Sequence, residues 1–182
     1  MSDAPRSVPS EAAPAAGRIE IRPIRREEVP AVWALMRGLA EYEKLLDLHT
    51  GTPALLESAL FGDGLRIEGR VAADGERLLG YMLFYPVFGS FRGLWRLWLE
   101  DLFVAPEARG LGVGERLMAE LARLATERGF ASVDWEVLDW NELALGFYRA
   151  KGARDMGGGW LHYRLDGEAM AKLAGEGSGS AR

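Results

Sequence analysis

The sequence contains no cysteine and only two histidines, His49 and His162. The lack of cysteine excludes disulfides, thiolate metal sites and a cysteine nucleophile. The two histidines lie far apart and do not form a metal-ligand spacing, so we expect no metal site. No apolar run approaches the roughly 20 residues that span a bilayer, and the N-terminus lacks the apolar core of a signal peptide. We therefore expect a cytoplasmic protein without a membrane partner.

Positive charge is also scarce. The 182 residues include 22 Lys and Arg against 27 Asp and Glu, a net charge of -5, and the basic residues form no block. A protein that follows a phosphate backbone needs such a block, so nucleic acid is not expected as a partner. Hydrophobic residues make up 48% of the chain, which is typical of a globular protein, and the length fits one domain.

The two ends of the chain differ in composition from the rest. Residues 1–17 contain Pro5, Pro9 and Pro14 among alanine and serine, with almost no large apolar side chain. Residues 175–182 have the same character. Such segments bury too little surface to offset the entropy of ordering, so we expect a flexible leader and a flexible tail. The folded domain is predicted to span residues 18–174.

Hydrophobic spacing predicts an alternation of strands and helices in this domain. The expected order is strand, two helices, three strands that form a meander, then helix, strand, helix and strand, followed by a short helical tail. This order has no internal repeat and favours an α/β (α+β) protein with a mixed sheet over a doubly wound one. The expected strands are 18–24, 67–73, 78–87, 94–104, 131–137 and 159–165, and the expected helices are 29–46, 53–60, 113–129, 142–150 and 168–173.

The most informative stretch runs from Leu99 to Gly114: a strand, a short loop, and a glycine-rich turn that opens a long helix. Glycines let backbone N–H groups converge on an anion, and a helix N-terminus adds partial positive charge, so the stretch predicts a pyrophosphate site. A P-loop would need Gly-Lys-Ser/Thr, and the glycine spacing does not match the dinucleotide fingerprint. The pattern that remains is Arg-x-x-Gly-x-Gly, formed by Arg109, Gly112 and Gly114.

This pattern resembles the acetyl-CoA pyrophosphate motif of the GCN5-related N-acetyltransferases (GNAT), in which a strand ending in Phe-Val-x-Pro likewise precedes it. Further segments resemble the diamine acetyltransferases, that is, the spermidine/spermine and thialysine group: LAEYEKL at 39–45, LED at 99–101, LDWN at 138–141 and GEAMAKLA at 167–174. The resemblance covers about residues 19–174 and is closest to the thialysine branch. It implies the GNAT fold, a mixed, mostly antiparallel central sheet flanked by helices, with acetyl-CoA as cosubstrate, a small-molecule amine as acceptor, and a homodimer.

The resemblance also implies catalytic roles. An alkylammonium has a pKa of about 10.4, so it must lose a proton before it attacks a thioester. Glu100 matches the family's proposed base, and Tyr148 matches the acid that protonates the departing thiolate, whereas we interpret the neighbouring Phe147 as a packing residue. Tyr42 and Glu43 match residues that line the amine pocket together with Glu100, although both also fit a helix end that faces water.

The remaining matches concern the cofactor. Asn141 matches a residue near the pantetheine arm, although an ordinary helix N-cap explains it equally well. The residues expected to bind acetyl-CoA are Leu102, Phe103, Val104, Arg109, Gly110, Leu111, Gly112, Val113, Gly114, Glu115, Asn141 and Tyr148.

Several points stay open at the level of the sequence. Strand alternation predicts that Asp101 points away from Glu100. The aromatic side chains of 88, 91, 95 and 98 form either a wall of the substrate pocket or a dimer face. The polyamine enzymes carry an acidic pair before Gly-Trp, which this chain lacks after Asp155, and this weakens the case for long polyamines. Two other functions remain: a protein or peptide N-acetyltransferase, and a non-catalytic acyl-CoA-binding module.

Overall fold

The computed structural model describes residues 19–64, 66–157 and 163–178, and the chain divides into two compact units. Unit 1 extends to Leu138, and unit 2 begins at Asp139. The expected leader, residues 1–17, lies outside the described residues.

Unit 1 is built on a five-stranded sheet with the order β1-β2-β3-β4-β5. Neighbouring strands are antiparallel, except that β5 runs parallel to β4. The mixed, mostly antiparallel sheet expected from the sequence is therefore confirmed. The strands are β1 (Glu20–Pro23), β2 (Glu68–Asp74), β3 (Arg77–Gly89), β4 (Leu94–Val104) and β5 (Val133–Asp134).

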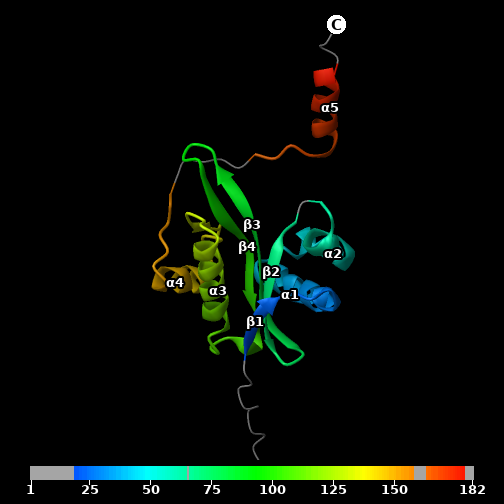
Figure 1. Ribbon diagram of the computed structural model, residues 1–182. Helices are drawn as coiled ribbons and strands as arrows, with labels where there is room; N and C mark the ends of the chain where they lie inside the picture. Colours follow the sequence, from blue (N-terminus) through cyan, green and yellow to red (C-terminus); the bar gives the residue numbers. More distant parts are fainter. Residues whose placement is uncertain (1–18, 65, 158–162, 179–182) are drawn as a thin grey trace, which may run out of the picture. The chain divides into compact units, whose positions relative to one another are not determined.

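Helices cover both faces of this sheet (Figure 1). Helices α1 (Val29–Tyr42) and α2 (Pro53–Phe61) lie against one face, and α3 (Val113–Glu127) lies against the other. Single turns of 3-10 helix precede α1 (η1, Arg26–Glu28), separate α1 from α2 (η2, Leu46–Leu48) and follow β4 (η3, Pro106–Ala108).

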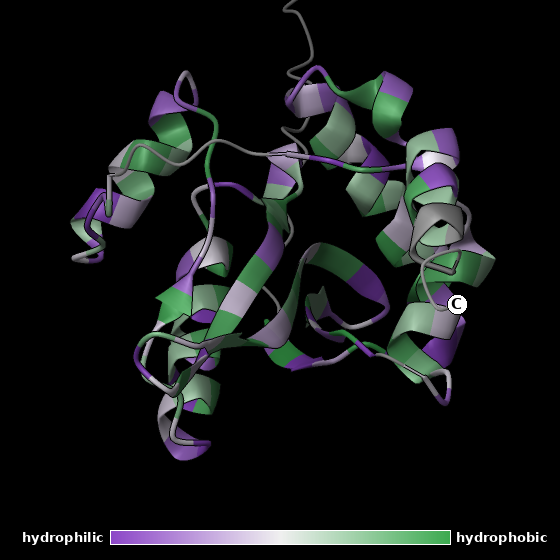
Figure 2. Ribbon diagram, turned by 90° about the horizontal axis from the view of Figure 1, so that it is seen from above, coloured by the Kyte–Doolittle hydropathy of each residue, from purple (hydrophilic) through white to green (hydrophobic). Residues whose placement is uncertain are grey.

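Each face of the sheet has its own hydrophobic core. Seen from above, the helices of unit 1 carry both hydrophobic and hydrophilic residues, as expected of helices with one face on a core (Figure 2). The core under α3 includes Met82, Phe84, Leu97, Leu99, Val113, Leu117 and Leu121. The core under α1 and α2 includes Val29, Val32, Leu56, Val71, Tyr81, Leu83 and Phe103.

The predicted bounds differ from the structure at two places in unit 1. The helix expected to reach Leu46 ends at Tyr42, because Lys44 adopts a left-handed backbone conformation with a φ of 62° that no helix can continue through. Of the strand expected over 131–137, only Val133–Asp134 forms a strand, β5, with Leu97 and Trp98 as its partners.

Unit 2 contains α4 (Glu142–Ala150) and α5 (Gly167–Ser178). Helix α5 extends beyond the expected helical tail at 168–173 and includes the first residues of the expected flexible tail. The last predicted strand, 159–165, falls partly on residues 158–162, which lie outside the described residues, and the described residues 163–165 are not part of a strand.

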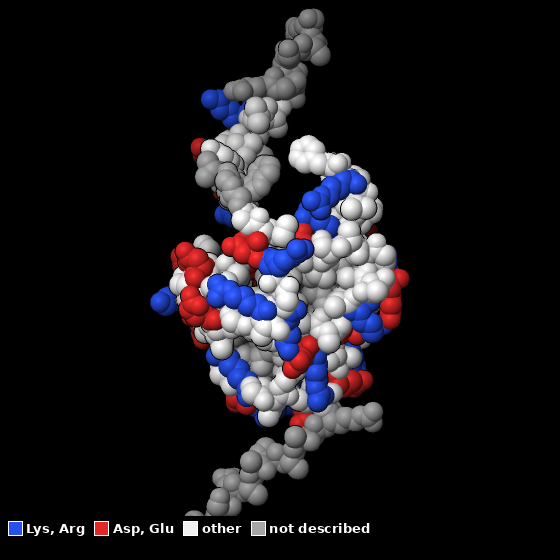
Figure 3. Space-filling view, turned by 90° about the vertical axis from the view of Figure 1, so that its left-hand side faces the viewer, with Lys and Arg blue, Asp and Glu red and all other residues white. Residues whose placement is uncertain are grey.

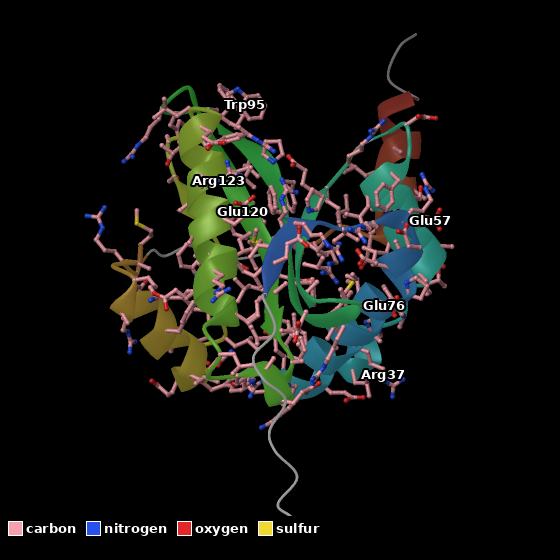
Figure 4. All side chains as sticks on the ribbon, turned by 60° about the horizontal axis from the view of Figure 1, so that its bottom comes forward. Arg37, Glu57, Glu76, Trp95, Glu120 and Arg123 are labelled. Atoms are coloured by element: carbon pink, nitrogen blue, oxygen red, sulfur yellow. The ribbon has the colours of Figure 1, made fainter. Side chains whose placement is uncertain are left out.

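The outer surface of α3 is an ion-pair network. The guanidinium of Arg123 donates to the carboxylates of Glu120 and Glu127, at distances of 2.5 to 2.9 Å. Arg70, which is only 9% exposed, reaches the same Glu120 from β2 at 3.5 Å. Figure 3 shows acidic and basic side chains interspersed on one face of the molecule, and Figure 4 labels Glu120 and Arg123 on α3.

We predict that Gly80→Ala destabilises unit 1. A Cβ atom at Gly80 would lie 2.6 Å from the carbonyl oxygen of Phe103 on the neighbouring strand, so the two backbones must move apart. Overpacking of this kind costs about 1–3 kcal/mol. Urea denaturation measures the change. Gly64→Ala is the control, because among the described residues no atom lies within 4 Å of a Cβ there. Equal stability of the two variants would contradict the prediction.

Candidate active site

A β-bulge in β4 lies at the centre of the candidate site. Leu83 of β3 pairs with Asp101, but the next residue, Phe84, pairs with Leu99, so Glu100 is an extra residue in β4. A bulge of this type shifts the alternation of side chains by one residue. Two consecutive residues can then point to the same face of the sheet.

Hydrogen bonds show that Glu100 and Asp101 do share a face. Tyr81 and Tyr85 are four residues apart on β3 and therefore lie on the same face. The hydroxyl of Tyr81 donates to Asp101 at 3.1 Å, and that of Tyr85 donates to Glu100 at 3.0 Å. The expectation that Asp101 points away from Glu100 was therefore wrong, because it assumed an unbroken strand. Both carboxylates lie on the side of α1, as does Phe103.

The Glu100 carboxylate is exposed and is held by two donors. The Tyr85 hydroxyl and the indole N–H of Trp98 both bind its Oε2 atom, each at 3.0 Å. Burial, the hydrogen bond to Glu100 and the negative charge of Glu100 together raise the pKa of Tyr85 to about 12. The Tyr85 phenol therefore remains a hydrogen-bond donor throughout the neutral and moderately alkaline range.

The Asp101 carboxyl, in contrast, is largely buried. Its pKa is raised from 3.8 to about 6, mainly by burial and also by the charges of Glu100 and Glu43, and the hydrogen bond from Tyr81 only partly opposes these effects. Burial also raises the pKa of Glu43, which follows α1 directly. The pKa of Tyr81 is raised well above its ordinary value, mainly by burial. These groups create a negative potential that favours a cation.

A ring contact links the predicted amine pocket to the predicted cofactor turn. The guanidinium of Arg109 lies over the ring of Tyr42, 5.1 Å from its centroid. Tyr42 is the last residue of α1, and Arg109 follows η3 directly. The structure therefore brings Tyr42, expected at the acceptor, next to Arg109, expected at acetyl-CoA.

The turn before α3 has the backbone geometry of an anion site. Gly110 and Gly112 have φ angles of 81° and 73°, and Gly112 is the N-cap of α3. Since glycine has no side chain, the N-cap residue itself offers no oxygen to the N–H groups of the first helical turn, which is the part of a helix that binds anions in other proteins. Val113 is buried in the core, so only its backbone can face a ligand. Leu111 is half exposed, Gly114 is partly buried and Glu115 is exposed.

The end of β4 supplies the second part of the predicted cofactor site. The side chains of Leu102 and Val104 pack on the core under α3, and Phe103 packs on the other. In the described part of the chain, pairing of β4 with β5 ends at Trp98. The backbone of residues 102–104 on that edge is therefore not occupied by β5, and its N–H groups can serve a carbonyl or amide of a ligand.

The other two predicted site residues belong to unit 2. The Asn141 side chain accepts a hydrogen bond from the backbone N–H of Ala144 at 3.2 Å, so it caps α4. The rings of Phe147 and Tyr148 are 5.3 Å apart in an edge-on arrangement. The placement of Tyr148 at the site of Glu100 stays a prediction from the resemblance.

The described residues contain no group of three or more His, Cys, Asp or Glu side chains that could hold a metal ion. In the same residues, no helix is long and apolar enough to cross a membrane.

Sequence reasoning did not identify Tyr81 and Tyr85 as residues of the site, and it named Trp98 only as part of a pocket wall or a dimer face, without a contact to Glu100. The break in apolar alternation, from Leu97 and Leu99 to Leu102 and Val104, was a visible signal of the bulge. The two tyrosines carried no signal of their own, because they lie on a neighbouring strand among apolar residues.

The chain is similar to known proteins in sequence and in fold. The acetyltransferase (GNAT) family matches residues 35–153. The chain is similar to the thialysine N-epsilon-acetyltransferase of cattle, with 35% identity over 87% of this chain and 98% of the relative, and to that of pig, with 34% identity over 86% and 97%. A solved integron cassette protein from the mobile metagenome of V. cholerae superposes with a TM-score of 0.69 at 25% identity, over 86% of this chain and 97% of that one.

The chain belongs to the GNAT acetyltransferase family, and the predicted GNAT fold is confirmed. It is an N-acetyltransferase that depends on acetyl-CoA, the co-substrate that this family uses.

We predict that Gly112→Ala weakens the use of acetyl-CoA. Alanine at a positive φ costs about 1–2 kcal/mol, so the turn should change shape and its N–H groups should no longer converge. The KM for acetyl-CoA should rise about tenfold or more, with a smaller change in the KM for the amine.

Gly75→Ala is the matched control, because Gly75 has a φ of 62° in the β2–β3 turn, and at both positions no described atom lies within 4 Å of a Cβ. Both variants should lose similar stability, but Gly75→Ala should keep the wild-type KM for acetyl-CoA. A similar change in the KM for acetyl-CoA in both variants would contradict the assignment of the turn at Gly112 to acetyl-CoA binding.

We further predict that Asp101 makes the stability of the enzyme depend on pH. Because its pKa is raised from 3.8 to about 6, the folded state binds more protons than the unfolded state in this range. The free energy of unfolding therefore falls as pH rises through it, by up to about 3 kcal/mol from this group, and the loss persists above it.

Asp101→Asn keeps an oxygen for the Tyr81 hydroxyl and removes the titration. Relative to the wild type, it should gain stability between pH 4 and pH 7.5 in urea denaturation. Asp47→Asn, at an exposed position, is the control and should show a constant difference. Parallel stability curves for wild type and Asp101→Asn would disprove the prediction.

Proposed function

We propose that the enzyme transfers the acetyl group of acetyl-CoA to a primary amine of a small molecule, a thialysine-like amino acid, a diamine or a polyamine. The observation that carries this proposal is the bulge, which places the Glu100 and Asp101 carboxylates on one face. A small alkylammonium is the kind of acceptor that such an acidic face attracts. The names of the cattle and pig relatives are consistent with it.

In this proposal, Glu43 and Asp101 attract and hold the ammonium form of the acceptor. Asp101 remains ionised beside a cation, because an opposite charge lowers a carboxyl pKa. Asp101, which was not among the predicted substrate residues, therefore joins Tyr42, Glu43 and Glu100 at the acceptor. The missing acidic pair after Asp155 favours amino acids and short diamines over long polyamines.

Glu100 accepts a proton from the ammonium, directly or through one water molecule. The neutral amine then attacks the thioester carbonyl, and the backbone N–H groups of residues 102–104 stabilise the negative charge on its oxygen. When the C–S bond breaks, the Tyr148 hydroxyl gives its proton to the thiolate. The nitrogen, which gave its first proton to Glu100, loses a second proton to solvent as the amide forms. Turn residues 109–115 hold the pyrophosphate, and Asn141 contacts the pantetheine arm.

Other parts of the proposal concern the whole protein. Residues 18–174 act as one acetyltransferase domain, because the family match at 35–153 crosses the boundary between the two units. The exposed aromatic side chains of Phe88, Phe91 and Trp95 near the β3–β4 hairpin support a homodimer. A cytoplasmic location stays a prediction.

Release of the coenzyme A thiol tests the proposal. The acceptor panel comprises thialysine, lysine, ornithine, putrescine, spermidine and short peptides, each with the wild type, Glu100→Gln and Tyr148→Phe. We expect transfer to a free amino acid or diamine, with turnover about 10²–10⁴-fold lower in Glu100→Gln and strongly reduced in Tyr148→Phe.

Activity on peptides alone would indicate a peptide acetyltransferase. Binding of acetyl-CoA without transfer to any amine would indicate a non-catalytic module. Full turnover in either variant would remove the role of that residue.

A further inference from the structure

The orientation of Glu100 depends on two aromatic side chains that the family motif does not include. Glu100 is exposed and lies at a bulge, so neither burial nor regular pairing with β3 restricts its side chain. Its Oε2 atom nevertheless accepts two hydrogen bonds of 3.0 Å, from the Tyr85 hydroxyl and from the Trp98 indole.

We propose that Tyr85 and Trp98 are positioning residues that hold the Glu100 carboxylate in one orientation, with its Oε1 atom free to take the proton of the acceptor amine. This inference rests on the proposed role of Glu100 as the base.

The two donors form a rigid pair. Tyr85 and Trp98 are direct partners across the β3–β4 ladder, so their side chains leave the sheet next to each other. Trp98 precedes Glu100 by two residues, which places it on the same face. An indole N–H can only donate, and the Tyr85 phenol, with a pKa of about 12, remains a donor as well.

Both hydrogen bonds bind the same oxygen, Oε2, so the other oxygen of the Glu100 carboxylate can accept a proton. Within the described part of the chain, Oε1 of Glu100 accepts no hydrogen bond. When Oε1 takes a proton, Oε2 becomes the carbonyl oxygen of the acid and still accepts from both donors. The two hydrogen bonds therefore persist before and after the proton transfer, and the base needs no rearrangement between its two states.

Orientation matters because proton transfer requires a short, aligned contact. A base must lie about 2.6–3.2 Å from the atom that it deprotonates, and a displacement of 1 Å can lower the rate about 100-fold. A glutamate side chain without its two donors would populate several rotamers, of which few present Oε1 to the amine.

The test removes each hydrogen-bond donor and keeps an aromatic ring at both positions. Tyr85 also lines a hollow of about 310 Å³ together with Arg66, Ile67 and Pro86, so a phenylalanine at 85 preserves that wall. We expect Tyr85→Phe and Trp98→Phe each to lower kcat about tenfold at pH 7.5, with the KM for acetyl-CoA within twofold of the wild type. Trp95→Phe is the control. Trp95, labelled in Figure 4, belongs to the same strand, but its ring lies tilted against that of Phe88, and it lines a different hollow together with Phe130.

Two further measurements separate positioning from a general loss of structure. In a Glu100→Gln background, Tyr85→Phe and Trp98→Phe should have no additional effect, because the group on which they act is gone. In the wild-type background, their defect should shrink as pH rises from 7.5 toward 10, where the free amine no longer needs a base. Asp101, with a pKa of about 6, is ionised throughout this range.

The outcomes are distinct. A kcat within twofold of the wild type in both variants, or an equal loss with and without Glu100, would overturn the positioning role while leaving Glu100 as the base. Full turnover of Glu100→Gln alone would overturn the proposed function itself.

Discussion

The extra residue in β4 is the constraint on which the site depends. Leu97, Leu99, Leu102 and Val104 all pack on the core under α3, although their spacing changes from two residues to three between Leu99 and Leu102. An unbroken strand would have turned Asp101 into that core, and a buried carboxylate without a partner is strongly destabilising. The bulge resolves this conflict, because it keeps the four apolar side chains on one face and sends both carboxylates to the other. The acidic face therefore follows from the packing of apolar side chains in the core under α3.

The acidic face, formed by Glu100 and Asp101, lowers the stability of the folded protein. Tyr81 is fully buried and satisfies Asp101, yet burial still raises the pKa of that carboxyl to about 6. Glu43 and Glu100 add like charges nearby. An enzyme that binds a cation gains from this arrangement, because the cation relieves a repulsion that is already present in the free protein. Functional sites commonly retain such local destabilisation, which the rest of the fold offsets.

Much of the fold could be predicted from the sequence where local patterns agree with tertiary packing. Thr52 caps α2 as its position suggests, and the β2–β3 hairpin and α3 lie where periodicity places them. The end of α1 could not be predicted, because helical spacing continues past Tyr42 and only the left-handed Lys44 ends the helix. Within the site, Glu100 and the glycine turn followed from the motif. Asp101, Tyr85 and Trp98 did not, since their roles depend on a bulge and on pairing between strands.

The glycine at the start of α3 has a consequence for the whole of unit 1. Helix α3 covers one face of the sheet, yet its N-cap residue, Gly112, has no side chain that could cap the first turn. In the proposed function, the pyrophosphate of acetyl-CoA binds at this turn, and its oxygens would accept hydrogen bonds at the place where a capping side chain is missing. The free energy of ligand binding is then added to the folding of α3 and the core beneath it, and the resistance of the protein to heat follows the concentration of its cosubstrate. If the turn binds acetyl-CoA as proposed, the concentration of acetyl-CoA would therefore affect the stability of the enzyme as well as its rate.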